Sequence, residues 1–191
     1  MKRVIVKSAL ITLCLLLAFI AVSIAVITAH FPMVVADLTF KVDNKKSCVE
    51  YTEKAYHISQ DIGDLAILTE RCIWADDNLK IIKYAEILIT EEGYDEFLLS
   101  KDGGYAYYIA SEYVIALYDE GYNVKAVESA FQSSKGFEDI GPVHRLIATC
   151  NDKKDFQTLN TIKQKLLTYS GDEYADYLIT LIDNALTKAN T

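Results

Sequence analysis

Carboxylate and histidine side chains at helical spacing are the first candidates for chemistry in this sequence. Glu50, Glu53 and His57 follow one another at intervals of three and four residues, so a helix would present them on one face. Such a face can supply metal ligands, but no second carboxylate–histidine element accompanies it, and we interpret it as a solvated surface. His30 is expected at a membrane boundary, and His144 on the surface of a first helical turn.

Motifs for nucleophilic catalysis and for phosphate binding are missing from the sequence. It contains no GxSxG, HExxH, P-loop or GxGxxG pattern. Ser133-Ser134-Lys135 lacks the SxxK spacing of an acyl-transfer serine, and Cys150 has no histidine that would make a catalytic pair. We therefore predict a non-enzyme without cofactor or metal, and an enzyme with an unrecognised site is the alternative.

The four cysteines do not have the spacing of metal ligands, because no CxxC pair occurs. Cys14 lies within an apolar run, and the other three follow it. Cys48 and Cys72 are each 12 residues from a turn expected at position 60, so an antiparallel helix hairpin would bring them together. They are the candidate disulfide, and two buried free thiols are the alternative. Three cysteines after the run leave at least one, such as Cys150, unpaired.

A group of tyrosines is the most distinctive local composition. Tyr113 and Tyr118 fall on an apolar stripe and are expected in the core. Tyr105, Tyr107 and Tyr108 follow a Gly-Gly break and form the candidate partner-binding surface, because exposed tyrosine is enriched at such surfaces. Ordinary packing of large side chains is the alternative for these three.

The longest apolar run, Ser8–Ala29, contains no charged residue, glycine or proline. A bilayer core requires about 20 apolar residues in a helix. We predict a transmembrane signal-anchor helix over residues 8–31, preceded by a cytoplasmic basic tail at residues 1–7. A cleaved signal peptide is the alternative, with a small-residue site at Val34-Val35-Ala36.

Charge predicts the orientation of this segment. Lys2, Arg3 and Lys7 precede the run, and all 27 acidic residues follow it, beginning with Asp37. The positive-inside rule therefore predicts a single-pass protein of the cell membrane with a cytoplasmic N-terminus and an extracytoplasmic C-terminal domain. The part after the run carries 16 basic residues and a net charge of −11, which disfavours nucleic-acid binding and flat contact with anionic lipid.

Residues 32–46 are expected to connect the anchor to the domain. Leu38, Phe40 and Val42 alternate with polar residues, which is the period of a strand. Because a single short strand has no partner here, we predict an extended linker.

Residues 47–191 are predicted to form one all-α domain built from antiparallel helix hairpins. Apolar residues recur at intervals of three and four, and glycines fall at the ends of these stretches. Ser47, Asn123 and Asp155 are the expected N-caps of three helices, and a fourth helix is expected to open at Asp77 or Asn78.

Part of this domain resembles the tetratricopeptide (TPR) repeat. Leu117–Gly121, followed by Ala126, is similar to the family's Gly-containing turn and the small residue in its second helix. Leu159 stands at the corresponding place 33 residues later, and Ile81 stands 45 residues earlier, with an insertion at residues 94–104. The resemblance covers about half of the chain, and Ile81 and Leu159 depart from the family's small residue. It implies a curved stack of helix pairs whose concave face binds a peptide, whereas a generic α-solenoid or bundle is the alternative.

These observations predict a membrane-anchored, non-catalytic domain that binds an unknown protein or peptide. Its other expected partner is the lipid bilayer, through residues 8–31, and no nucleic acid or small-molecule substrate is expected. A structural or self-assembling subunit of a membrane complex is the main alternative.

Overall fold

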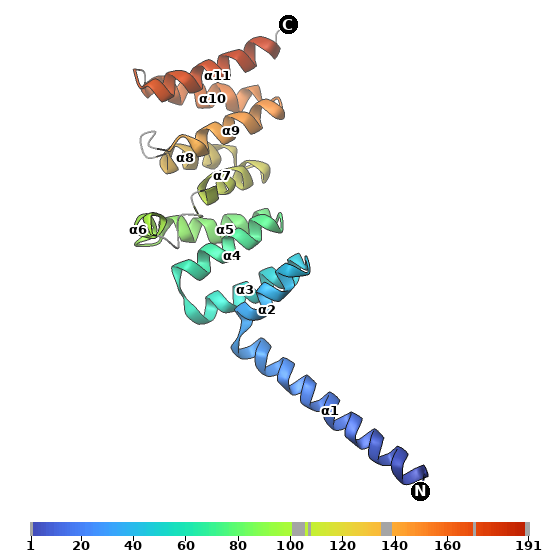
Figure 1. Cartoon of the computed structure of the whole chain (residues 1–191). Helices are drawn as coiled ribbons and strands as arrows, with labels where there is room; N and C mark the ends of the chain where they lie inside the picture. Colours follow the sequence, from blue (N-terminus) through green and yellow to red (C-terminus); the bar gives the residue numbers. More distant parts are fainter. Residues whose placement is uncertain (1, 101–105, 107, 135–138, 170, 190–191) are drawn as a thin grey trace. The chain divides into compact units, whose positions relative to one another are not determined.

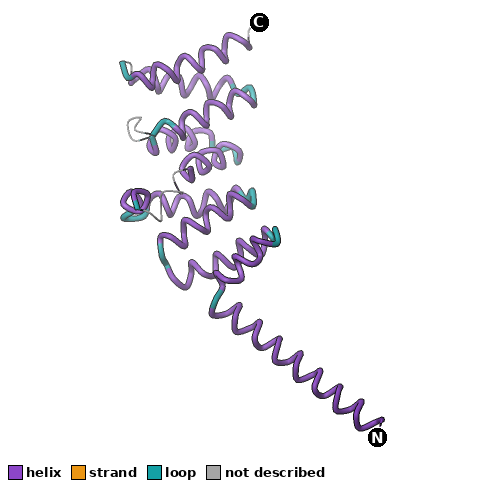
Figure 2. The backbone as a smooth tube through the Cα atoms, viewed as in Figure 1, coloured by secondary structure: helices purple, strands orange, loops and turns teal. Residues whose placement is uncertain are grey.

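The computed structural model describes residues 2–100, 106, 108–134, 139–169 and 171–189 (Figure 1). Within these residues every regular element is a helix, as Figure 2 shows, so the predicted all-α class is confirmed. The elements are α1 (Lys2–His30), α2 (Pro32–Lys41), α3 (Lys45–Ser59), α4 (Ile62–Trp74), α5 (Asn78–Thr90), α6 (Tyr94–Leu99), α7 (Ile109–Asp119), α8 (Asn123–Ser133), α9 (Gly141–Asp152), α10 (Phe156–Leu166), η3 (Leu167–Tyr169) and α11 (Glu173–Ala189). The chain forms two compact units, residues 1–71 and 72–191, which divide within α4.

The prediction of an extended linker over residues 32–46 is wrong, because Pro32–Lys41 forms helix α2. Pro32 stands in the first turn of α2. There its fixed φ suits a helix, and its missing N–H would have no partner within the helix in any case. The short turn after α2 leads directly into α3, and the two helices pack against each other.

Small side chains, and not the larger apolar ones, form the inner face of α2. Ala36 is buried and Thr39 is half-buried, whereas Leu38, Phe40 and Val42 are exposed. The alternation is therefore not a strand signal here, because Leu38 and Phe40 leave the helix on different sides and Val42 follows its end. Thr39 also donates its hydroxyl hydrogen to the carbonyl of the preceding turn, which removes a polar group that a packed surface would leave unpaired.

In the first unit, α1 contacts the beginning of α2, and α2 lies along α3. The inner face of α3 has the spacing of a helix stripe and consists of Cys48, Val49, Thr52 and Ala55, all of them buried. Because α2 leads away from α1 and α3 turns back, the last turns of α3 lie near the end of α1 (Figure 1).

In the second unit, α5 packs on α6 and α7, and α7 packs on α8 and α9. Helix α9 also contacts α8, α10 and α11. Each helix contributes an apolar stripe, and the largest fully buried side chains of the unit are Tyr84, Leu88, Ile109, Tyr113, Leu117, Leu146, Leu159, Ile162, Leu166 and Leu178. Burial of apolar surface stabilises the folded state by about 25 cal/mol per Å². The packing of these stripes is therefore the main source of stability in the unit.

Four turns in the chain share one hydrogen-bond geometry. In each, the residue that closes the turn donates its N–H to the carbonyl five residues before it: Asn44 to Thr39 (2.9 Å), Asp77 to Cys72 (3.1 Å), Tyr122 to Leu117 (2.9 Å) and Asp155 to Cys150 (2.8 Å). The residue before each closing residue has a left-handed backbone, with φ of 56° at Asp43, 57° at Asp76, 82° at Gly121 and 56° at Lys154. This is the Schellman ending of a helix, which satisfies its last carbonyls.

Some of the predicted N-cap residues are caps in the structure and others are not. Asp155 caps α10 as expected, accepting the N–H of Thr158 at 3.0 Å. Ser47 is not the cap of α3, because the Asn44 side chain accepts the N–H of Ser47 itself at 3.2 Å. Asn123 is the first residue of α8 and not its cap. The turn geometry explains the shift, since the residue that closes a Schellman turn is already the cap position of the next helix.

Candidate functional site

The most exposed apolar surface of the molecule is that of α1. Its segment Ile11–His30 is long and apolar enough to cross a membrane, and none of its residues is buried in the protein. Leu15, Leu17, Phe19, Val22 and Ile24 all leave more than half of their surface exposed. A soluble helix would cover one such face with other elements, so this surface fits an apolar solvent. A secretory signal sequence would show the same composition.

A pocket of about 540 Å³ lies where the end of α1 meets the last turns of α3. Its lining comes from the three first helices: Thr28, Ala29, Pro32, Tyr51, Lys54, His57 and Ile58. The ammonium nitrogen of Lys54 lies 4.6 Å from the centroid of the Tyr51 ring, which is a cation–π contact. His57, which the sequence placed on a solvated face, is exposed at this pocket.

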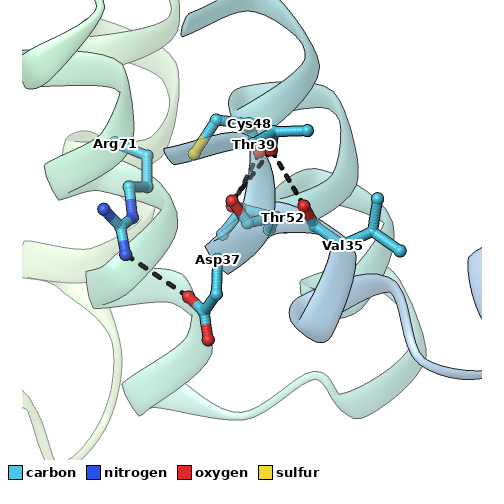
Figure 3. Close-up of polar contacts among 7 residues, drawn as sticks. Val35, Asp37, Thr39, Cys48, Thr52 and Arg71 are labelled. Atoms are coloured by element: carbon cyan, nitrogen blue, oxygen red, sulfur yellow. Dashed lines mark hydrogen bonds and ion pairs between the residues drawn. The ribbon is translucent and has the colours of Figure 1, made fainter. Parts of the chain in front are cut away.

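In the same unit, Arg71 of α4 contacts α2 (Figure 3). Its Nη2 is 3.4 Å from Oδ1 of Asp37, and its guanidinium carbon is 3.4 Å from the centroid of the Phe40 ring. A planar guanidinium on an aromatic face gains from both charge and stacking. Arg71 therefore holds the outer face of α2, including the exposed Phe40.

Cys48 lies in the interior of the same group of residues (Figure 3). Thr52 donates its hydroxyl hydrogen to the carbonyl of Cys48 at 2.8 Å. Burial raises the pKa of the Cys48 thiol, while Arg71 and the hydroxyls of Thr52 and Thr39 offset part of the rise. Because the thiolate is the reactive form, this environment is that of an inert, structural cysteine and not of a nucleophile.

The predicted Cys48–Cys72 disulfide is not formed in the structure, in which both side chains are buried. The pairing stays a prediction for the oxidised protein. Cys150 is likewise a buried free thiol, and burial raises its pKa to about 11. None of these three thiols has the exposed, cation-rich surroundings of a reactive cysteine.

In the second unit, Tyr118 and Asp155 form the centre of a polar network that links α7 to α10. The Tyr118 hydroxyl donates to Oδ2 of Asp155 at 2.9 Å, and the Thr158 hydroxyl donates to the same oxygen at 2.7 Å. Burial raises the pKa of Asp155, but hydrogen bonds from the backbone and hydroxyl of Thr158 and from Tyr118 outweigh it, so that this pKa is lowered. Burial, together with the hydrogen bond to Asp155, raises the pKa of Tyr118. The arrangement stabilises a fixed carboxylate between the two helices.

Of the three tyrosines predicted to form a partner-binding surface, one lies among the described residues. Tyr105 and Tyr107 lie outside the described residues, and Tyr108 is 38% exposed. Sequence reasoning missed a different set of exposed apolar side chains, which lie at helix starts in the second unit. Leu79 is 65% exposed and Val124 is 73% exposed, each two residues after the residue that closes a turn. The available signal was weak, because Val124 has the spacing of the apolar stripe of α8 and only its place in the first turn sets it apart.

Comparison of the chain with protein families, with curated proteins and with solved structures gives no match. In the part of the chain that the structure describes, no group of three or more His, Cys, Asp or Glu side chains is arranged to hold a metal ion. The assignment of function therefore rests on the geometry of α1, its pocket and the exposed apolar residues.

Proposed function

We propose that this protein is a single-pass membrane protein whose helical domain binds a protein or peptide without catalysis. The observation that carries the proposal is the uncovered apolar surface of α1. In lipid, a helix pairs all its backbone groups internally, and its apolar side chains need no protein partner. The basic residues before this helix and the acidic chain after it favour a cytoplasmic N-terminus and an extracytoplasmic domain in the cell membrane.

The repeated turns support a TPR-like arrangement of helix pairs in the domain. Asn44 and Asp77 are 33 residues apart, as are Tyr122 and Asp155, and all four close turns of the same geometry. Ala126, at the place where TPR repeats have a small residue, is fully buried. Repeats of this kind stack on their neighbours and offer an extended binding surface.

Exposed apolar residues at the turns of the second unit support partner binding. The amide of Asn78 donates to Oε1 of Glu120 at 3.2 Å, so the beginning of α5 lies beside the turn before α8. Leu79, Tyr122 and Val124 are exposed around this contact, and we call them the turn patch. Apolar and aromatic side chains grouped in this way are typical of recognition surfaces.

Sidedness and insertion are tested on the full chain in cells. Because Cys150 is buried, the labelling site is introduced on the exposed face of α10 as Gln157→Cys. We expect the protein to resist alkaline extraction from membranes and to react with a membrane-impermeant maleimide on intact cells. Extraction into the soluble fraction would contradict the anchor, and labelling only after lysis would contradict the orientation.

Binding is tested by co-purification from solubilised membranes. We expect the same foreign protein to be recovered with the unaltered chain, and to be lost from a Leu79→Glu, Val124→Glu double variant. Tyr174→Glu and Tyr177→Glu, at exposed positions of α11, provide a control with the same added charge. Recovery of only further copies of this chain, especially if the α11 variant abolishes it, would instead support the self-assembling subunit.

A further inference from the structure

The pocket between α1 and α3 suggests a function beyond anchoring. We propose that it binds the phosphate headgroup of an anionic phospholipid. This inference rests on the proposed insertion of α1 into a membrane. The pocket lining is drawn from helices α1, α2 and α3 of the first unit and contains both polar and apolar side chains.

The pocket lies at the depth that a headgroup occupies when α1 spans the bilayer. Thr28 and Ala29 belong to the last turn of α1, at the end of the 20-residue segment Ile11–His30. A helix of this length has about the thickness of the hydrocarbon core, so its last turn reaches the polar interface. Phe31, directly after this segment, exposes an apolar ring at the end of α1.

The polar side of the pocket offers hydrogen-bond donors that suit a phosphate. Lys54 supplies an ammonium group, His57 an imidazole N–H and Tyr51 a phenolic O–H. Hydrogen bonds from a charged donor to phosphate are about twice as strong as neutral ones. The opposite side, with Ala29 and Ile58, is apolar and suits the glycerol carbons and the first methylene groups of the acyl chains.

The pocket lining contains a lysine and no carboxylate, which suits an anion although the domain as a whole is acidic. Lys54 makes no ion pair within the described residues, and its ammonium lies over the ring of Tyr51. Glu50 and Glu53 are on the same helix, but neither lines the pocket. An unneutralised lysine at the interface is attracted to anionic lipid, and the acidic remainder of the domain confines the contact to this place.

The size of the pocket also fits one headgroup. Its volume of about 540 Å³ falls within the range of about 300–1,000 Å³ of small-molecule sites. Its lining reaches the apolar surface of α1, so a bound lipid can leave its acyl chains in the bilayer beside that helix.

The test uses the full chain reconstituted in nanodiscs of phosphatidylcholine with a minority of phosphatidylglycerol. The protein is recovered in mild detergent, and its retained lipids are extracted and counted by mass spectrometry. We expect phosphatidylglycerol to be enriched over its bulk fraction, and Lys54→Gln to reduce this enrichment by about fivefold, the attraction of one lysine to anionic lipid. Lys46→Gln, an exposed lysine on α3 outside the pocket, is the charge-matched control and should keep the enrichment.

A parallel arm adds soluble glycerol phosphate during recovery. Because the acyl chains of a lipid add contacts that glycerol phosphate lacks, a competitor equimolar with the phosphatidylglycerol should leave the enrichment unchanged. Displacement by glycerol phosphate would overturn the lipid assignment in favour of a soluble phosphate compound, and equal loss in both lysine variants would show only a diffuse effect of charge. Absence of enrichment in a protein that still resists alkaline extraction would overturn the headgroup site alone, whereas a protein released by alkali would overturn the anchor itself.

Discussion

Phe40 and Tyr118 occupy the same place before the turn in two different helix pairs, and both rings lie against a cation. The guanidinium carbon of Arg71 is 3.4 Å from the Phe40 centroid, and the ammonium of Lys153 is 5.1 Å from that of Tyr118. Each cation also pairs with an aspartate of the helix that carries the ring. The same combination of a cation–π contact and an ion pair therefore stabilises the ends of two helices.

The two rings differ in burial and in what they join. Phe40 is 38% exposed and has no polar atom, whereas Tyr118 is 7% exposed and bonds through its hydroxyl to Asp155. That hydroxyl joins the end of α7 to the residue that closes the turn before α10. Both cation contacts already join the ring's helix to a later helix, and the Tyr118 hydroxyl adds a hydrogen bond that Phe40 cannot make. The difference predicts that the second unit depends on its ring far more than the first.

Truncation of the two rings should give the largest difference. We expect Tyr118→Ala to lower the free energy of unfolding by about 3 kcal/mol, because it leaves a cavity and an unpaired site at Asp155. Phe40→Ala should cost about 1 kcal/mol, because its ring is part-exposed and contributes mainly the stacking on Arg71. The measurement is hydrogen exchange by mass spectrometry on the full chain in detergent, read separately for peptides of α2–α3 and α7–α10.

Tyr118→Phe separates the ring from the hydroxyl. It should cost about 1 kcal/mol, the value of one buried hydrogen bond. A cost as large as that of the alanine variant would mean that packing contributes little here. Equal costs for Phe40→Ala and Tyr118→Ala would refute the comparison.

The closing residues of the two turns should differ in the same direction. Asp155→Ala removes the cap of α10 and the acceptor for the Tyr118 hydroxyl, so we expect a loss of about 2 kcal/mol. Asn44→Ala removes only the cap of α3, for a loss of about 1 kcal/mol. Thermal unfolding followed by circular dichroism ranks the two variants. Asp77→Ala, at a cap that accepts the N–H of Lys80 at 3.1 Å, is the matched control and should resemble Asn44→Ala.

The contrast between these pairs also explains what could be predicted from sequence. The stripe of Val143, Leu146, Ile147 and Cys150, followed by the cap Asp155, predicted α9 and the start of α10. Helix α2 was not predicted because its inner face is formed by Pro32, Ala36 and Thr39. These side chains are too small or too polar to give the apolar periodicity of a helix. Its larger apolar residues, Leu38 and Phe40, are exposed, so their spacing does not report the buried face of the helix.

The candidate sites depended on contacts that spacing does not encode. The headgroup pocket exists because α2 is a helix that returns α3 to the end of α1, and an extended linker would not have produced it. The Tyr118–Asp155 hydrogen bond joins residues 37 positions apart. Only the recognition that the turns before α8 and α10 are equivalent repeats could have suggested it. The apolar run of α1 was predictable because it depends on local composition alone.

The lowered pKa of Asp155 predicts a pH dependence that Asn44 cannot show. A carboxylate whose pKa is lower in the folded than in the unfolded state stabilises the fold above its unfolded pKa, which is about 3.9 for aspartate. That contribution is lost as the pH falls through the folded pKa. The cost of Asp155→Ala should therefore be full at neutral pH and shrink under acid conditions, whereas that of Asn44→Ala should not change with pH. Urea titrations of the two variants across this range test the expectation, and a pH-independent cost for Asp155→Ala would contradict it.

Substitution of the two cations should change the free energy of unfolding least. It also separates the contribution of charge from that of stacking. Arg71→Met should cost about 1 kcal/mol, because the guanidinium is largely buried between Phe40 and the Asp37 carboxylate. Lys153→Met should cost about 0.5 kcal/mol, since its ion pair with Asp119 is exposed and screened by salt. Arg71→Lys tests the cause, because lysine keeps the charge but cannot stack as a plane. If Arg71→Lys retains full stability in hydrogen exchange of α2–α3, charge alone holds the helix end, and the two rings differ only in the hydroxyl of Tyr118.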